Sequence, residues 1–346
     1  MLRADRLHSS IRLPRRATIV FLALGSASLA VICLTTAFGE YSISVWSVIS
    51  TLFGHGSRVD NVVIRLFRLP RILECVLVGA ALGLSGGVYQ ALTRNPLASP
   101  DIIGVNEGAA VVAVFMILRG SPADLVPIGA FGGAIAVVLI VGALGVRRQF
   151  SMYRLILVGI GISSFGGAII AYLLTLPSSS ANFYRLEVAQ QWLVGAMSGA
   201  SWHGVRVLGL ALLIITPIVL ALSRELDTFQ LGDDLSTALG LRSTRLQIVL
   251  ALLGALLAAV VVSVAGPIGF VAFISPHIAR RLARTSSAAA LPVAMVVGGL
   301  LVLLSDYAAQ RIFEPTELPV GIMTVVLGAP YLLFLLYKTE RRTGFA

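Results

Sequence analysis

The stretch ATIVFLALGSASLAVICLTTAF, residues 17–38, decides the fold class, because it is predominantly apolar and contains no charged residue. A helix needs about 20 apolar residues to cross a hydrocarbon core of about 30 Å. The run is longer than the apolar region of a signal peptide, and no clear small-x-small cleavage site follows it. We therefore expect it to stay attached to the chain as a first membrane-spanning helix.

Further apolar runs follow along the whole chain. Together with the first they predict spans at residues 17–38, 72–92, 102–118, 126–146, 155–176, 205–222, 246–265, 268–278, 291–305 and 320–337. Apolar residues make up 57% of the 346 positions and charged residues 12%, so a water-soluble fold could not hide this surface. The sequence predicts an all-α polytopic membrane protein with about ten transmembrane helices and no large soluble domain.

The basic residues predict the orientation. Ten crossings place both termini on one side, and most of the 26 Lys and Arg residues fall there, as is typical of a cytoplasmic face. We expect cytoplasmic tails at residues 1–16 and 339–346 and a single transmembrane domain at 17–338. The net charge of +10 does not indicate nucleic acid, because the basic residues punctuate the apolar runs instead of clustering on a soluble face.

The only long polar stretch on the predicted cytoplasmic side is RELDTFQLGDDLSTALGLRSTR, residues 224–245. Asp233 and Asp234 could serve as an N-cap or a first turn for a helix over residues 235–239. Gly240 is suited to the stop after that helix. The pattern predicts a short helix at the membrane surface.

Four arginines crowd together just before the second span, on the side opposite the termini: Arg58, Arg65, Arg68 and Arg71. Two interpretations remain open, anchoring to lipid headgroups and docking of an acidic partner outside the membrane. Glu74 follows Arg71 by one turn, which predicts a local ion pair between the two side chains.

Motifs that carry chemistry are scarce. The sequence has no GxxxxGK[ST] loop, and its one lysine is Lys338, so any ATP used is expected to bind another chain. No catalytic set or metal motif is visible, and His277 beside Pro276 is expected to be structural; we predict a chain that is not an enzyme and holds no metal or cofactor. Few ionisable residues fall within spans, which argues against an ion-coupled secondary transporter without excluding it. A structural or scaffolding membrane protein also stays open.

Six stretches, in the right order, resemble the FecCD family of binding-protein-dependent permeases. They are RLPR at 68–71, GAALGLSGGVYQ at 79–90, RNPLASPDIIGV at 94–105, LGDDLSTALGL at 231–241, AGPIGFVAFISPHIARRL at 265–282 and ELPVGIMTVVLGAP at 317–330. The likeness covers about residues 41–338. Within the family the chain is most similar to siderophore permeases, especially the second permease of the ferric enterobactin type.

The resemblance implies the architecture of a type II ATP-binding-cassette (ABC) importer permease, with an inverted repeat relating spans two to five and seven to ten. It implies a multi-pass protein of the bacterial cell membrane (inner or plasma membrane) that translocates a ferric siderophore; cobalamin and haem are the alternative substrates. The implied partners are a second permease subunit, two cytoplasmic ATPase subunits that bind ATP and Mg, an extracytoplasmic substrate-binding protein and membrane lipid. A paralogue is favoured as the second permease, and a homodimer is the alternative.

Carried over residue by residue, the resemblance also implies three sites. The element that couples to the ATPase would comprise Asp233, Asp234, Ala238, Leu239, Gly240 and Leu241. The surface that docks the binding protein would comprise Arg68, Arg71, Gln310 and Arg311, where Gln310 stands in place of a third family arginine. The inner gate would comprise Asn95, Leu97, Ser151, Met152 and Tyr153. Glu74 stands where the family usually has an apolar residue, and the resemblance does not explain it.

Overall fold

The computed structural model describes residues 15–37, 44–52, 55–147, 149–150, 152–176, 180–241, 243–314 and 316–343, and these residues are helical almost throughout. The helices are α1 (Arg15–Ala37), α2 (Val45–Leu52), α3 (Arg58–Val62), the π-helical turn η1 (Val63–Arg68), α4 (Leu69–Thr93), the 3-10 turn η2 (Pro100–Ile103), α5 (Val105–Arg119), α6 (Val126–Gly145), α7 (Met152–Thr175), α8 (Ser180–Val194), α9 (Trp202–Ala221), α10 (Ser223–Phe229), α11 (Asp233–Ala238), α12 (Ser243–Ala265), α13 (Val271–Ala283), α14 (Leu291–Arg311) and α15 (Val320–Thr343). Two short strands, β1 (Val146–Arg147) and β2 (Gln149–Phe150), pair in an antiparallel hairpin.

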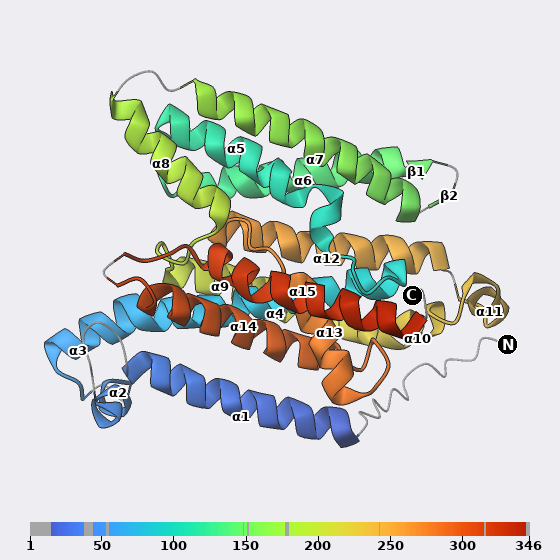
Figure 1. Ribbon diagram of the computed structural model, residues 1–346, viewed down its shortest axis with the longest axis horizontal. Coiled ribbons are helices and arrows are strands. Elements are labelled where there is room, and N and C mark those ends of the chain that lie inside the picture. The colour runs from blue at the N-terminus through green and yellow to red at the C-terminus, as the bar shows by residue number, and fades with distance from the viewer. Residues whose placement is uncertain are drawn as a thin grey trace, which may run out of the picture.

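The long helices lie side by side along one axis, so the bundle has two ends (Figure 1). The end where α1 begins and α15 ends also carries β1, β2, α10 and α11, and we call it the terminal end. The other end, called the opposite end, carries α2 and α3. The first and last described residues therefore lie at the same end of the bundle, as an even number of crossings requires.

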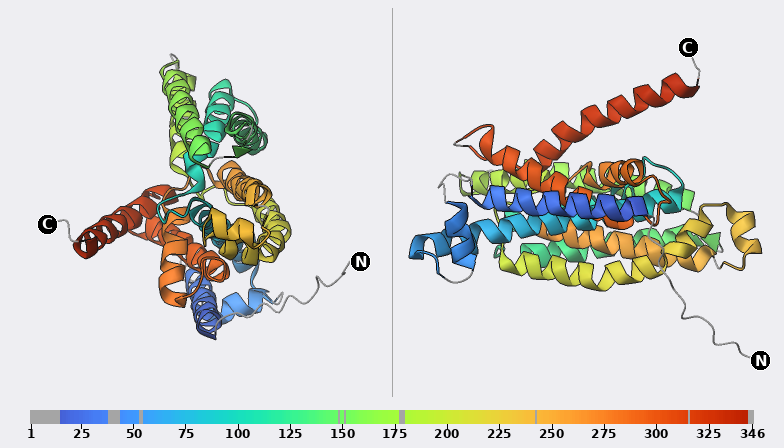
Figure 2. Two further views of the ribbon diagram at one scale, coloured as in Figure 1. Left: turned by 90° about the vertical axis from the view of Figure 1, so that its right-hand side faces the viewer. Right: turned by 90° about the horizontal axis from the view of Figure 1, so that it is seen from below.

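The spans agree with the prediction of about ten. Seven helices, counted over the part of the chain that is described, are long and apolar enough to cross a membrane, and α5, α13 and α15 accompany them. Helix α13 has only 13 residues because the helical conformation is interrupted before it. In the segment between α12 and α13, Gly266 and Phe270 both take positive φ angles (72° and 67°). Figure 2 shows α15 leaving the bundle toward its C-terminal end.

Helix α4 is the centre of the bundle and is almost completely buried. It packs against α9, α12, α13 and α14. A Cβ atom at Gly79 would overlap the carbonyl oxygen of Gly298 on α14, and a Cβ at Gly298 would overlap that of Gly79. The two backbones can therefore approach this closely only because both positions are glycine.

Polar side chains inside the bundle are matched to backbone acceptors on neighbouring helices. The hydroxyl of Ser85 donates to the carbonyl oxygen of Gly254 at 2.7 Å, and that of Tyr89 donates to Ala251 at 2.9 Å. Both bonds join α4 to α12. A hydroxyl without such a partner would be costly in an apolar surrounding, so these contacts also fix the register of the two helices.

Helix α8 is the longest of the elements that the sequence did not predict, which also include α2, α10 and the β1–β2 hairpin. Its residues SANFYRLEVAQQWLV are too polar and too few for an apolar span. It packs against α5 on one side of the bundle (Figure 1). The spacing of Tyr184, Val188 and Trp192, each four residues after the last, is a helical signal that could have revealed it.

Candidate functional site

The polar segment 223–241 forms a compact projection at the terminal end. Asp233 and Asp234 occupy the first turn of α11, one of the two placements that the sequence allowed, and Gly232 is the N-cap. Gly240, at φ 78°, ends the helix: its N–H donates to Thr237, and the N–H of Leu241 donates to Ser236. This pair of bonds is a Schellman motif, which confirms the predicted glycine stop.

The surface of this projection is unusually apolar for a polar segment. Leu231, Leu235 and Leu239 follow one another at intervals of four residues and are 60%, 59% and 68% exposed. Asp234 and Ala238 are exposed beside them. An open pocket of about 810 Å³ adjoins the projection and is lined by Leu222, Glu225, Gly240, Leu241, Arg245, Leu246 and Val249. Exposed apolar side chains next to a hollow are typical of a surface that a partner covers.

The predicted docking residues lie together at the opposite end. Arg68, Arg71 and Gln310 all line one small pocket with Asp306. The side chain of Arg68 donates to the carbonyl oxygen of Thr36 on α1 at 2.8 Å. Residues from segments that are distant in the sequence therefore lie together in one cluster.

Arg71 is held by acidic residues of its own chain. Its guanidinium lies 3.0 Å from a carboxylate oxygen of Asp306 and 3.0 Å from one of Glu317. Gln310 also donates to Asp306, at 2.7 Å. The side chain of Arg71 is only 18% exposed. An acidic partner could reach this guanidinium only by competing with carboxylates that already neutralise it.

Arg311 points to a different environment from its neighbour Gln310. It forms an ion pair with Glu314 one turn away, and its guanidinium lies 5.8 Å from the centre of the Tyr307 ring. Both partners of this pair are partly exposed, so solvent screens it. The pair of Arg311 is thus more exposed than the pair of Arg71 with Asp306.

The predicted ion pair between Glu74 and Arg71 is wrong. Glu74 is buried, and its carboxylate accepts a hydrogen bond of 3.1 Å from the backbone N–H of Ser201. Ser201 is the N-cap of α9 and in turn accepts from the N–H of Gly204. A carboxylate at the first turn of a helix complements its unpaired N–H groups, so Glu74 holds α9 against α4.

The predicted gate residues lie at the terminal end on two separate segments. Asn95 and Leu97 belong to the turn after α4, where the Asn95 side chain accepts from the N–H of Leu97 at 2.9 Å. Met152 and Tyr153 begin α7, and Tyr153 is 72% exposed. Ser151 lies outside the described residues.

The turn after α4 leads into η2, which carries a carboxyl group with a shifted pKa. The pKa of Asp101 is raised to about 6, chiefly by burial and also by nearby Glu107, while hydrogen bonds from Ser99 and Asn106 oppose the shift. The bond from Asn106 also ties η2 to the first turn of α5. The start of α5 is therefore held close to the predicted gate residues.

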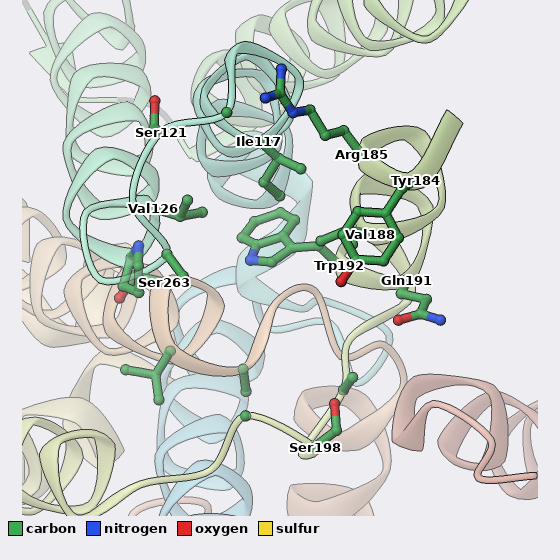
Figure 3. A pocket seen from close by; sticks show the side chains of 17 residues that line it. Ile117, Ser121, Val126, Tyr184, Arg185, Val188, Gln191, Trp192, Ser198 and Ser263 are labelled. Atoms are coloured by element: carbon green, nitrogen blue, oxygen red, sulfur yellow. The ribbon is translucent and has the colours of Figure 1, made fainter. Parts of the chain in front are cut away.

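A cavity of about 540 Å³ lies beside α8, and sequence analysis missed it together with that helix. Figure 3 shows the indole of Trp192 in this space, with Ile117 and Val126 from the neighbouring segments around it. Arg185 lies over the end of α5 and donates to the carbonyl oxygen of Leu118 at 3.4 Å. The cavity is mostly apolar, and its one arginine serves the end of a helix.

Comparisons with known proteins agree on one family. The model of the FecCD transport family matches residues 27–338. A probable siderophore transport system permease of Bacillus subtilis, YfhA, is 39% identical over 94% of this chain and 96% of its own length. The ferric enterobactin transport system permease FepG of Escherichia coli is 35% identical over 96% of this chain and 99% of its own.

A solved structure shares the fold over nearly the whole chain. It is described as a metal-chelate type ABC transporter in an inward-facing conformation. Its TM-score is 0.84 at 29% sequence identity, and the match covers 93% of this chain and 99% of that one. The family match over residues 27–338 includes all the sites described above.

Proposed function

The chain belongs to the FecCD transport family, and on this premise we propose that it is the transmembrane permease subunit of an ABC importer that takes up a ferric siderophore. The chain is a permease of the metal-chelate and siderophore type. The observation that carries the proposal is the projection of α10 and α11, with its row of exposed leucines, at one end of the bundle. A subunit driven by a separate ATPase needs such a surface.

In the proposed mechanism the terminal end faces the cytoplasm and the opposite end faces the binding protein. The binding protein delivers its cargo at the cluster of Arg68, Arg71, Gln310 and Arg311. Two ATPase subunits bind ATP and Mg. The projection of this chain binds to an ATPase subunit through Leu235, Leu239 and the turn at Gly240. The chain itself contributes no nucleotide site, cofactor or covalent chemistry.

The inner gate opens when the projection moves. Asn95 and Leu97 on one segment, and Ser151, Met152 and Tyr153 on the other, close the path with small, amide and apolar side chains. Such a closure excludes water without binding the cargo tightly. A large chelate can then leave the path once the two segments separate.

The proposed assembly contains two permease subunits in the bacterial cell membrane (inner or plasma membrane), with both termini in the cytoplasm. A paralogue of this chain is favoured as the second subunit, and a homodimer is the alternative. The ferric siderophore is favoured as the cargo because the relatives YfhA and FepG carry siderophore names. Cobalamin and haem are the alternatives within the same class of importer.

Transport in proteoliposomes tests the proposal. The purified complex of permease, ATPase and binding protein is reconstituted, and uptake of iron-labelled siderophores, labelled cobalamin and haem is compared. We expect ATP-dependent uptake of a siderophore, and none with an ATPase unable to hydrolyse ATP. Uptake that persists with the inactive ATPase would instead indicate an ion-coupled transporter, and absence of all uptake would indicate a scaffold.

A further inference from the structure

One side chain joins two of the sites that lie far apart in the sequence. Arg94, beside the predicted gate residue Asn95, donates from Nη2 to the carbonyl oxygen of Phe229 at 2.7 Å. The centre of its guanidinium also lies 4.4 Å from the centre of the Phe229 ring. Phe229 is the last residue of α10, four positions before Asp233. The contact therefore bridges the gate turn and the projection.

The backbone of Arg94 is fixed to the end of α4. Arg94 is the C-cap of that helix, with φ 51° and ψ 29°, and its N–H donates to Ala91. The next N–H, that of Asn95, donates to Gln90. Glycine would adopt this left-handed conformation without strain. The presence of arginine at this position therefore indicates that its side chain has a role.

Phe229 is equally well fixed at the other end of the contact. It is 4% exposed and packs in the core with Leu226, which is fully buried. Only the three residues 230–232 separate it from α11. A displacement of α11 by a partner thus reaches the Phe229 carbonyl over a short segment.

The far side of α10 is attached to the connection between α13 and α14. Asp227 accepts from the hydroxyl of Ser286 at 2.6 Å and from the N–H of Ala288 at 3.1 Å. Gln230 accepts from Ser287 at 2.9 Å. Helix α10 is therefore held between the turn after α4 and the connection between α13 and α14. If α10 moves as a rigid body, it displaces both of these segments.

We propose that Arg94 is a positioning residue that transmits the movement of the α10–α11 projection to the gate turn at Asn95 and Leu97. The inference rests on the proposed function and names the contact through which coupling travels. A simpler role would be a cap for the carbonyl groups at the end of α10. The two roles differ in what they predict: loss of a cap weakens the projection itself, whereas loss of transmission separates ATP hydrolysis from transport.

The test measures both activities in the same proteoliposomes. For Arg94→Gln we expect ATP hydrolysis within about twofold of the wild-type complex and uptake reduced by about tenfold or more, the size of a typical coupling between sites. Arg94→Lys keeps the charge but loses the planar fork, so an intermediate loss of uptake is expected. The matched control is Arg284→Gln, because Arg284 is also an arginine at a left-handed helix C-cap, at the end of α13.

A double-variant cycle tests whether the effect passes through Phe229. In a Phe229→Leu background the ring contact is already absent, so Arg94→Gln should reduce uptake by a smaller factor than in the wild type. Wild-type uptake by Arg94→Gln would overturn the inference, and so would a parallel fall of hydrolysis and uptake together with loss of the assembled complex. Failure of the wild-type complex to transport would overturn the proposed function instead, so the two outcomes are distinguishable.

Discussion

The two ends of the molecule use their side chains in opposite ways. At the opposite end, Arg71 is neutralised by Asp306 and Glu317 of the same chain. At the terminal end, Leu235 and Leu239 are left exposed to water. At the opposite end the charge of Arg71 is thus paired within the chain, whereas the leucine side chains of the projection are left exposed.

This difference separates stability from partner binding. A charge pair that is mostly shielded contributes to the fold of its own subunit, and breaking it leaves an uncompensated charge. Exposed apolar side chains contribute little to the fold and gain their stabilisation only when a partner covers them. We therefore expect substitutions at the opposite end to change stability first, and substitutions at the terminal end to change coupling first.

The largest effect is expected from Gly240→Trp. The added bulk would prevent the projection from seating in the ATPase, so ATP-dependent uptake should fall to the level of empty vesicles while membrane insertion is kept. Gly240→Asn is the control, because asparagine tolerates the positive φ of 78° and is small. Uptake and co-purification of the ATPase are the measurements. Normal uptake by the Trp variant would show that the turn at Gly240 does not couple the permease to the ATPase.

The next effect is expected from Asp306→Ala at the opposite end. It leaves Arg71 without its most buried partner, and we expect a loss of about 3 kcal/mol in the free energy of unfolding. Glu314→Ala breaks the exposed pair with Arg311 and should cost less than about 1 kcal/mol. Denaturation in detergent compares the two variants, and equal losses would contradict the distinction drawn between shielded and screened pairs.

A smaller effect is expected from Leu239→Asp on the projection. Stability should change little, because the side chain is 68% exposed. Affinity for the ATPase should weaken by about 2 kcal/mol, as for an apolar anchor lost from an interface. Leu239→Met, which keeps the apolar volume, is the control in a binding titration. Unchanged affinity of the Asp variant would show that the leucines are covered by something other than the ATPase.

The smallest effect is expected from Arg68→Glu. We expect docking of the binding protein to weaken by about 1 kcal/mol, because the charge lies near a partly exposed rim. Arg119→Glu, at the same end but on α5, reverses an exposed charge away from the cluster and serves as the control. Surface binding at low and high salt measures the change. Identical affinities for Arg68→Glu and the wild type would leave lipid anchoring as the explanation of these arginines.

The sequence predicted the helical spans well because each depends on a local property. A run of about 20 predominantly apolar residues without a charge, as at 17–38, specifies a membrane helix without reference to the rest of the chain. The stop at Gly240 is equally local, since a positive φ angle favours glycine. The same reasoning failed for α8, because a half-polar helix that packs against α5 has no strong apolar run of its own.

The partners of charged side chains could not be predicted from sequence neighbours. Glu74 lies one turn from Arg71, yet it binds the start of α9, while Arg71 binds Asp306 on α14 and Glu317 beyond it. Side chains in a bundle meet across helices, and the sequence does not record which faces are turned toward each other. Proximity in the sequence was therefore misleading at this position.

By itself, the sequence determined the class of the protein, the approximate number of its membrane-spanning helices and the family to which it belongs, because these follow from composition, periodicity and motif order. Only the tertiary structure decided that Arg94 reaches Phe229 across 135 positions of sequence and that Arg71 is paired within the chain. Long-range contacts of this kind depend on how helices pack, and packing is fixed by close approaches such as Gly79 on Gly298.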